Sequence, residues 1–298
     1  MRIPHPIPYQ GSKRNLAPII LEYFPEDISR LIEPFAGSAA LSLAAIYYGK
    51  AGSLLLNDIN APLMALWHSI VHTPEQLAGA YEKLWFAQEG REREFYDLVR
   101  ARFNKTHQPD DLMYLLARCV KAAVRYNANG EFNQSPDNRR KGRQPGAMGK
   151  DIRDTASLLK GKVSLMSGDY HAALDMASSD DLVYLDPPYQ GVCANRDPRY
   201  MNKVLFDDFV KALDALNHRN ISFIVSYDGR TDAKTFGNPL PDFLNLERVE
   251  MNAGRSSQAT LLGRKAITYE SLYLSPALVN RLDANTSTRQ LALFEAAQ

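Results

Sequence analysis

Residues 31–58 read LIEPFAGSAALSLAAIYYGKAGSLLLND and contain two short apolar runs with a helix-like stretch between them. The runs at 31–35 and 53–57 have the length and composition of buried strands, and residues 39–48 favour a helix. A turn of small residues, Ala36-Gly37-Ser38, joins the first run to this helix. A strand–turn–helix–strand order is typical of a βαβ unit, so we expect an α/β fold with a parallel sheet and helices on both faces.

The strand pattern continues only in the second half of the chain. It returns at 162–169, 181–189, 221–229, 246–251 and 269–275, with a helical segment at 206–218. Between the two halves, residues 77–85, 92–103 and 111–123 have helical spacing, and Asn129-Gly130 is a hairpin-turn signal in a polar stretch at 125–149. We expect the rest of that polar stretch to be mobile unless it is bound. The sequence predicts one α/β domain, 1–69 and 156–298, with a flexible tail from 276, interrupted by a mostly helical insertion at 70–155 that carries a β-hairpin.

Basic and acidic residues are nearly equal in number, but they are unevenly distributed along the chain. The 298 residues include 35 Lys and Arg against 34 Asp and Glu. Residues 91–153 nevertheless carry a surplus of six positive charges, and the rest of the chain carries a net five negative charges. Local basicity of this kind can mark a surface for a polyanion. A solvated helical face with a basic loop explains the charge equally well.

Composition excludes several classes of protein. A hydrophobic share of 45% excludes general disorder. The two cysteines, Cys119 and Cys193, cannot form a disulfide framework or a four-thiolate zinc site, and we interpret them as reduced thiols of a cytosolic protein. No apolar run reaches the roughly 18 residues of a membrane span, and the N-terminus lacks the apolar core of a signal peptide. We therefore expect a cytoplasmic protein with no membrane contact.

The most specific motif is Asp186-Pro187-Pro188-Tyr189, directly after the apolar run Leu182–Leu185. A strand would deliver this carboxylate to its C-terminal end, where open α/β sheets bind ligands. The prolines remove backbone donors, and their neighbouring carbonyls remain as acceptors. Asp186 and the Pro187 carbonyl can accept both N–H hydrogens of an exocyclic amino group on a planar base, and Tyr189 can stack on that base. The alternative is a strand-ending turn with an incidental Asp.

Two further candidate ligand-binding features follow the first two predicted strands. The turn at Gly37 lets a ligand approach the backbone closely, although it is neither G-x-G-x-x-G nor a phosphate loop. Asp58 ends the next strand about 20 residues later, a spacing that suits a carboxylate for ribose hydroxyls. A helix N-cap is an equally good interpretation of Asp58 when it is taken alone.

Together these motifs resemble those of the Dam-type DNA adenine-N6 methyltransferases, over most of the chain from Tyr9 to about Leu274. The resemblance implies a Rossmann-like methyltransferase sheet, S-adenosyl-L-methionine as cofactor, S-adenosyl-L-homocysteine as product, and direct methyl transfer to a flipped adenine. It assigns the catalytic motif to Asp186, Pro187, Pro188 and Tyr189. It assigns cofactor binding to the motifs YQGSKRNL, EPFAGSAAL, NDIN, SGDY and DPPY, through Tyr9, Lys13, Glu33, Phe35, Gly37, Ser38, Asp58, Asp169, Tyr170 and Asp186.

The insertion resembles the family's target-recognition region. RYNANGEFN, residues 125–133, is similar to the hairpin that touches DNA in the family. Family members that methylate GATC continue with Pro-Phe-Gly, whereas here Asp137 follows Pro136, which puts GATC in doubt. Residues 190–202 match no family pattern in detail, and a closing loop and a plain surface loop both remain open. The candidates for base contact are Arg125, Asn127, Asn133 and Gln134, and those for phosphate contact are Arg139, Arg140, Lys141 and Arg143.

The C-terminal sequence contains one further motif. Residues 290–294 read QLALF and resemble the pentapeptide by which bacterial proteins dock on the replicative sliding clamp. Gln290, Leu291, Leu293 and Phe294 would fill apolar pockets from a flexible segment. The alternative is a short helix packed back on the domain. The expected partners are double-stranded DNA and this clamp, in a bacterial, phage or mobile-element setting near the nucleoid.

Other activities fit the residues less well. An RNA adenine methyltransferase conflicts with the DNA-type hairpin, and a protein glutamine methyltransferase would begin its motif with Asn where Asp186 stands. Cytosine C5 methylation needs a Pro-Cys nucleophile, which the sequence lacks. A catalytically silent DNA-binding regulator conflicts with the intact motifs. We expect no metal, since two prolines after Asp186 do not favour a nuclease-type pair with Asp169.

Overall fold

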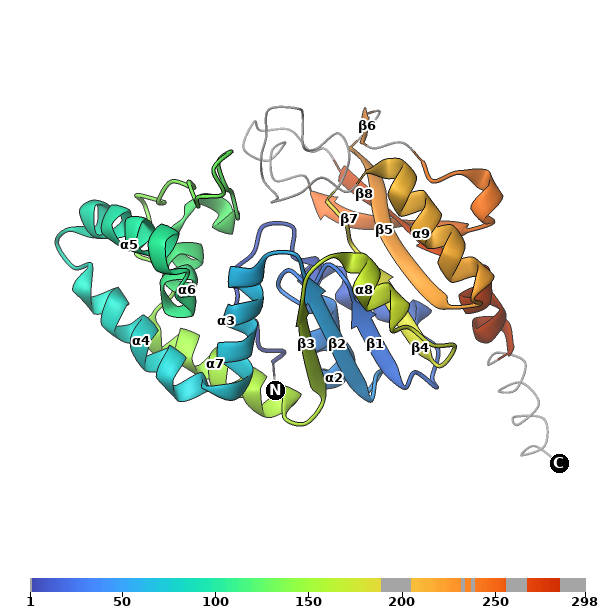
Figure 1. The fold of residues 1–298 in the computed structure, drawn as a ribbon, viewed down its shortest axis with the longest axis horizontal. Coiled ribbons are helices and arrows are strands. Elements are labelled where there is room, and N and C mark those ends of the chain that lie inside the picture. The colour runs from blue at the N-terminus through green and yellow to red at the C-terminus, as the bar shows by residue number, and fades with distance from the viewer. Residues whose placement is uncertain (1, 189–204, 232–233, 237–238, 256–266, 285–298) are drawn as a thin grey trace.

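The computed structural model describes residues 2–188, 205–231, 234–236, 239–255 and 267–284. Within these residues one mixed sheet has the order β3-β2-β1-β4-β5-β8-β7 (Figure 1). The first five strands of this order are parallel, as predicted. Their bounds are β1 Arg30–Glu33, β2 Ser53–Asp58, β3 Val163–Ser167, β4 Asp181–Leu185 and β5 Ser222–Thr231. The antiparallel strands are β6 Lys234–Phe236, β7 Glu247–Arg255 and β8 Ile267–Leu274.

Helices cover both faces of the sheet because successive strand residues point to opposite sides. On one face, Leu54 and Leu56 pack in a cluster with α2 (Ala40–Tyr47) and α3 (Ala61–His72). On the other face, Leu55 and Val183 pack with α8 (Tyr170–Asp175) and α9 (Phe206–His218). Figure 1 shows α8 and α9 in front of the strands and α2 behind them. The expected two-sided α/β architecture is confirmed.

The order of the strands creates a topological switch point between the paired strands β1 and β4. The chain runs outward from β1 through β2 to β3, then returns to place β4 on the other side of β1. The carboxyl ends of β1 and β4 therefore lie side by side while their following segments leave in different directions. Open α/β sheets bind ligands at such a switch point, so the fold brings residue 33 and residue 186 to the same edge.

The insertion is helical, and it is continuous with the main core. Its helices are α4 (Pro74–Ala87), α5 (Glu92–Thr106), α6 (Pro109–Arg118) and α7 (Pro145–Leu159). Tyr81, Tyr96 and Phe103 belong to the same buried cluster as the sheet residues under α3. The boundaries expected at 69/70 and 155/156 both fall inside helices, α3 and α7, so the exact division into domains remains a proposal. In Figure 1 the insertion stands beside β3.

The polar stretch from 125 to 149 is ordered against this insertion, contrary to the expectation of mobility. An antiparallel bridge between Tyr126 and Phe132 closes the predicted hairpin, with Gly130 at φ +76° in its turn. Beyond the hairpin, the backbone of Asp137 pairs with the carbonyl of Arg118. Side chains of the helices donate to backbone carbonyls in this segment, for example Tyr96 of α5 to Gln134. Polar residues can pack here because their backbone groups find buried partners.

The C-terminal segment also differs from expectation in part. Residues 276–284 are helical, not a flexible tail. Leu278 is fully buried, and the Arg281 guanidinium donates to the carbonyls of Ser179, Asp181 and Asp27. Residues 285–298, with the proposed clamp motif, lie outside the described residues. Across the described chain, none of the helices has the length and apolar character needed to span a bilayer.

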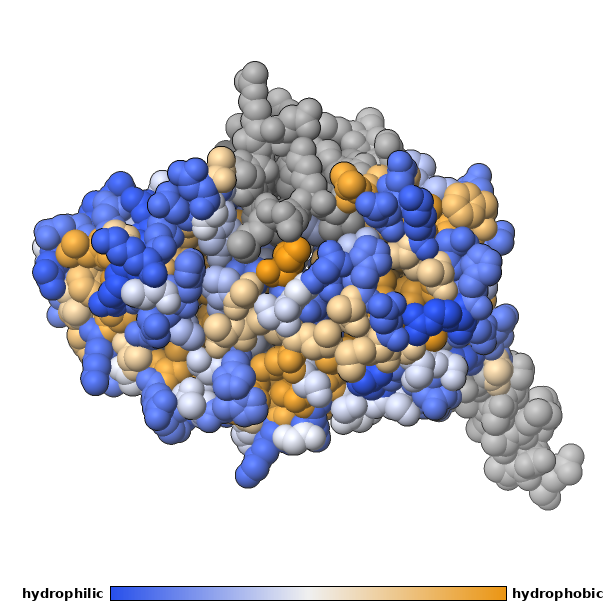
Figure 2. Space-filling view, in the orientation of Figure 1, coloured by the Kyte–Doolittle hydropathy of each residue, from blue (hydrophilic) through white to orange (hydrophobic). Residues whose placement is uncertain are grey.

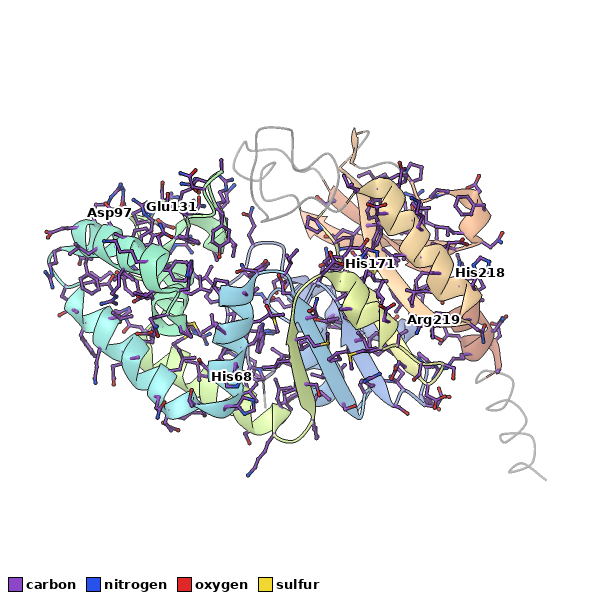
Figure 3. All side chains as sticks on the ribbon, viewed as in Figure 1. His68, Asp97, Glu131, His171, His218 and Arg219 are labelled. Carbon is purple, nitrogen blue, oxygen red and sulfur yellow. The ribbon has the colours of Figure 1, made fainter. Side chains whose placement is uncertain are left out.

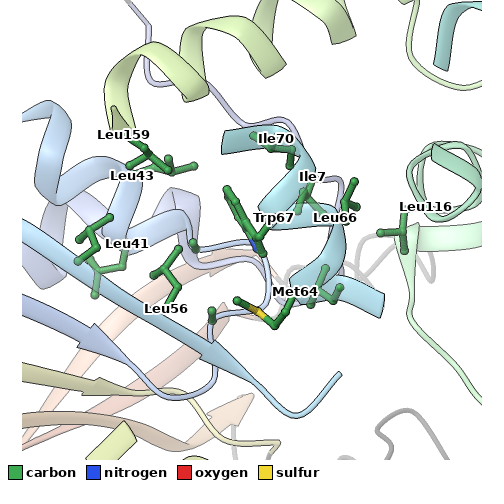
Figure 4. Packing of buried hydrophobic residues seen from close by; sticks show 14 of the residues in the cluster. Ile7, Leu41, Leu43, Leu56, Met64, Leu66, Trp67, Ile70, Leu116 and Leu159 are labelled. Carbon is green, nitrogen blue, oxygen red and sulfur yellow. The ribbon is translucent and has the colours of Figure 1, made fainter. Parts of the chain in front are cut away.

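The surface is polar over most of the face in Figure 2. Hydrophilic side chains cover the outer sides of the insertion helices and α9, with small apolar groups between them. Large apolar side chains gather inside, as Figure 4 shows for Trp67 among Leu41, Leu43, Leu56 and Met64. This core fixes α3 against the sheet, directly beneath the turn that contains Gly37.

Candidate active site

A cavity of about 640 Å³ opens at the carboxyl edge of β1, β2 and β4. All ten residues expected to bind the cofactor line it, together with Pro187 and Pro188 of the catalytic motif. Tyr189 lies outside the described residues. The structure therefore brings together side chains that are up to 177 positions apart in the sequence, from Tyr9 to Asp186.

The turn after β1 requires glycine at position 37. Its φ is +48°, and a Cβ atom there would lie 3.2 Å from the Tyr9 ring. The indole N–H of Trp67 donates to the Gly37 carbonyl at 2.9 Å and fixes the turn from below. The Ser38 hydroxyl donates to that of Ser12 at 2.9 Å, which ties the turn to the N-terminal segment. The absence of a side chain at Gly37 therefore lets the Tyr9 ring pack directly against this turn, and both line the cavity.

Asp58 holds the turn as well as facing the cavity. Its carboxylate accepts from the backbone N–H of Gly37 at 3.0 Å and from that of Asn60 at 2.9 Å. Burial raises the pKa of Asp58, although these two hydrogen bonds oppose the shift. The N-cap of α3 is Asn60, whose side chain accepts from the Leu63 N–H, so the alternative role of Asp58 as a helix cap does not hold.

Sequence reasoning missed Asn57, the neighbour of Asp58. Its side chain is fully buried, and its amide donates to the carbonyls of Pro34 and Gly168, at 3.0 Å each. These carbonyls belong to the segments that follow β1 and β3, so one amide joins three strand ends. The signal available in the sequence was a polar side chain at the end of an apolar strand run.

Aromatic rings form one side of the cavity. The rings of Phe35 and Tyr170 lie 5.1 Å apart, and His171 stacks on Tyr170 at 4.1 Å. Asp169 caps α8 by accepting from the backbone N–H of His171. Partial burial opposes a low pKa for Asp169, but the hydrogen bonds from His171 outweigh it and lower that pKa. Figure 3 shows His171 at the start of α8, at the edge of the sheet that carries the cavity.

Glu33 ends β1 and is almost entirely buried. Its carboxyl group accepts from the Ser42 N–H at 3.0 Å. Burial raises the pKa of Glu33 to about 8, and the nearby Asp186 charge adds to the shift. At neutral pH this side chain therefore carries a proton and no charge.

Lys13 places a positive charge beside the catalytic motif. Its side chain is 8% exposed, and Nζ lies 3.2 Å from an Asp186 oxygen and 2.9 Å from a Glu270 oxygen. Glu270 belongs to β8 and was not among the predicted site residues. No motif distinguishes it in the sequence, since only the antiparallel pairing of β8 with β5 brings it to this edge.

The residues expected to contact bases differ in solvent exposure and in hydrogen-bond partners. Asn133 is exposed, whereas Gln134 is buried and donates to the Val120 carbonyl at 2.8 Å. The Asn127 amide is engaged within the hairpin, where its oxygen accepts from the backbone N–H groups of Asn129 and Glu131. The side chains of Gln134 and Asn127 thus have hydrogen-bond partners within the insertion, and their contact with bases stays a prediction. Arg125 is half-buried beside them.

The residues expected to contact phosphates also divide into two groups. Arg139, Arg140 and Lys141 are largely exposed, at 92%, 74% and 55% of the side chain. Arg143 instead donates to the buried Asp151 carboxylate at 2.7 Å and to the His5 carbonyl. Arg143 therefore has a structural partner, which the sequence did not indicate.

In the residues that the structure describes, no three His, Cys, Asp or Glu side chains gather in a way that could hold a metal ion.

Comparison with known proteins agrees with this geometry. A family model described as D12 class N6 adenine-specific DNA methyltransferase matches residues 9–253. The DNA N-6-adenine-methyltransferase of Escherichia phage P1 is 29% identical over 189 residues, which are 61% of this chain and 23% of the phage protein. A type II methyltransferase of Lactococcus lactis subsp. cremoris is 29% identical over 191 residues, 61% of this chain and 64% of that protein. A DNA adenine methylase of Vibrio cholerae serotype O1 is 26% identical over 239 residues, 76% of this chain and 82% of that protein. The chain thus spans less than two thirds of the length of the first two relatives.

Proposed function

The chain belongs to the D12 class of N6 adenine-specific DNA methyltransferases, and on this premise we propose what it does. It transfers a methyl group from S-adenosyl-L-methionine to the N6 amino group of an adenine in double-stranded DNA. One observation carries the proposal: the ten residues matched to cofactor motifs, Asp186 among them, line the same cavity. Because the adenine cannot be reached inside a duplex, the enzyme must act on a flipped base.

The residues present fit the proposed cofactor. The turn at Gly37 and the Tyr9 ring packed against it both line the cavity, where they suit contact with its methionine part. The Asp58 carboxylate at the end of β2 suits ribose hydroxyls. Phe35 and Tyr170 offer aromatic surface for a purine ring. When bound, the cofactor supplies a methyl group activated by a positively charged sulfur.

Asp186 and Pro187 do the remaining chemistry. The Asp186 carboxylate and the Pro187 carbonyl accept the two N–H hydrogens of the adenine amino group. This keeps the nitrogen lone pair out of conjugation with the ring, so that it can attack the methyl group. The same Asp186 oxygen can take the proton that the amino group loses. The rate then comes from positioning and electrostatics, with no covalent bond to the protein.

The insertion supplies the DNA-binding surface in this proposal. Arg139, Arg140 and Lys141 are exposed next to the hairpin, where phosphate contacts would give salt-dependent affinity. Arg125 and Asn133 remain candidates for reading bases. The buried Gln134 and the engaged Asn127 support the hairpin that presents them.

A methyl-transfer assay tests the function. The chain is incubated with tritiated S-adenosyl-L-methionine and either duplex DNA or RNA, and the Asp186→Ala variant serves as control. We expect label in N6-methyladenine of DNA and none with the variant. Label in RNA alone would support the RNA alternative. DNA binding without any transfer would support a silent regulator, and equal label from Asp186→Ala would refute the mechanism.

We propose separately that residues 290–294 dock on a replicative sliding clamp, a partner suggested by the QLALF motif alone. This would direct methylation to newly replicated DNA. A pull-down with purified clamp compares the full chain with a chain that ends at Thr288. Retention of the full chain only is expected. Equal binding by both chains would remove the clamp from the proposal.

A further inference from the structure

Three charged side chains from distant parts of the chain meet beside the catalytic motif. Lys13 comes from the short N-terminal 3-10 turn η1 (Lys13–Asn15), Asp186 follows β4, and Glu270 lies in β8. Alternation along the strands explains the meeting. Leu182 and Tyr184 of β4, and Leu272 and Leu274 of β8, all point to the face that α2 and α3 cover. Asp186 and Glu270 continue these two alternating series, so both carboxylates lie on the face where the N-terminal segment packs.

The Lys13 ammonium is buried and pairs with both carboxylates. A charged group in a desolvated place is costly unless it is paired. Nζ lies 2.9 Å from Glu270 and 3.2 Å from Asp186, so Glu270 is the nearer partner. Both carboxylates are about one-fifth exposed, at 20% and 22%, and therefore interact with Lys13 under weak solvent screening.

We propose that Glu270 is a positioning residue for methyl transfer that acts through Lys13. By sharing the Lys13 charge, Glu270 keeps Nζ from pairing with Asp186 alone. The Asp186 carboxylate then keeps enough negative charge to accept the N–H of the substrate amino group and to take its proton. Without Glu270, the Lys13 ammonium would compete with the substrate for the same Asp186 oxygens. This inference rests on the proposed function and deepens it, since Glu270 belongs to none of the matched motifs.

Steady-state kinetics of the full chain test this role. Glu270→Gln keeps the shape and an acceptor oxygen but removes the charge. We expect kcat for methyl transfer to fall by about tenfold or more, as for loss of a charged hydrogen-bond partner. KM for DNA should stay within about twofold, because Glu270 is not among the residues proposed to contact DNA. Unchanged kcat, or a rise in KM for DNA as large as the loss in kcat, would overturn the proposal.

Glu250→Gln is the matched control. Glu250 lies on the neighbouring strand β7 and pairs with Arg230 at 3.1 Å, outside the residues that line the cavity. The Glu250→Gln variant loses one negative charge from the same sheet, as Glu270→Gln does, but keeps Glu270. Its kcat should therefore equal that of the wild type. A loss of kcat as large as that of Glu270→Gln would assign the effect to the stability of the sheet and contradict a specific role.

A double-mutant cycle with Lys13→Met separates an indirect role from a direct one. If Glu270 acts through Lys13, adding Glu270→Gln to Lys13→Met should lower kcat no further. A further tenfold loss in that background would overturn the proposal. Crystal structures of the wild type and Glu270→Gln give a test that needs no activity. Nζ should move closer to Asp186 than 3.2 Å in the variant, and an unmoved Nζ would contradict the inference. If the wild type itself transfers no methyl group, the proposed function fails while this structural test still decides the pairing.

Discussion

Glu33 shows how one buried residue can link the site to the stability of the chain. It is 3% exposed at the end of β1, and burial raises its pKa to about 8 from an ordinary value of 4.5. Between these two values the folded chain keeps a proton that the unfolded chain has lost. The folded state then binds more protons, so the free energy of unfolding falls as pH rises from about 4.5 to about 8.

Glu33→Gln should remove this dependence, because Gln resembles the protonated acid and can still accept from the Ser42 N–H. We expect the variant to gain stability over the wild type as pH rises through that window, by an amount on the order of a few kcal/mol. Urea unfolding of both chains at pH 5 and pH 8.5 measures it. The two chains share every other titrating group. An equal change in the free energy of unfolding between pH 5 and pH 8.5 would therefore show that Glu33 ionises normally in the folded chain.

At the scale of elements, the site depends on how closely β8 approaches β5. Gly229 of β5 lies opposite Glu270 of β8, next to an irregularity in the pairing after Ser226. A Cβ atom on Gly229 would stand 2.5 Å from the Tyr269 carbonyl oxygen, which is too close for any real contact. Since this oxygen belongs to the backbone of a paired strand, neither strand can yield without moving its neighbour. The strand that carries Glu270 can take its place only because position 229 has no side chain.

Gly229→Ala should therefore destabilise the chain, by about 1–3 kcal/mol, as overpacking does. Gly79→Ala is the control, because Gly79 lies inside α4 and a Cβ atom added there would meet nothing within 4 Å. That change should stabilise the chain by about 0.5–1 kcal/mol through helix propensity. Chemical denaturation measures both changes. Equal effects of the two substitutions would mean that β5 and β8 adjust freely.

Elements also show what sequence patterns could and could not predict. The apolar runs that became β1, β2, β4 and β5 were recognised because a strand buried on both faces is apolar throughout. The helix α7 was missed, since its first residues lie in the polar stretch 125–149 that was expected to be mobile, whereas Pro145 favours the first helical position. The sequence motifs identified ten candidate cofactor residues, and all ten line one cavity in the structure. Asn57 and Glu270 were not identified, because their roles arise from strand neighbours that are distant in the sequence.

At the scale of the whole molecule, the basic surplus of the insertion divides into two functions. Some of its arginines hold the molecule together. Asp151 of α7 is buried, and it pairs with Arg143 at 2.7 Å and with Arg2 at 2.9 Å, while its carboxylate also accepts from the His5 N–H. These contacts fasten the N-terminal segment, which leads to Tyr9 and Lys13, to the insertion. Other basic residues, such as Arg139, extend into solvent.

This division predicts opposite results for two sets of variants. Arg139→Ala combined with Arg140→Ala should weaken binding to duplex DNA of any sequence, because each lost phosphate contact removes counterion release. The slope of log K against log salt should become shallower by about one to two units. The melting temperature should fall only slightly, because the pair that Arg140 makes with Asp137 at 2.8 Å involves a largely exposed arginine. Arg143→Ala should leave that slope unchanged. It should instead lower the free energy of unfolding by about 1–3 kcal/mol, because the buried Asp151 loses a partner.

Fluorescence anisotropy with a labelled duplex at several salt concentrations, together with thermal melting, measures both effects on each variant. Arg153→Ala is a control for charge alone, since Arg153 lies on α7 of the insertion and pairs with the exposed Glu75 at 2.8 Å. If Arg143→Ala changed the salt slope as much as the combined substitution of Arg139 and Arg140, Arg143 would belong to the DNA-binding surface. If the paired variant changed stability but not the slope, the six-charge surplus would serve the fold and DNA would bind elsewhere. The net charge of +1 is thus compatible with a DNA-binding protein only because basic residues are both concentrated and exposed.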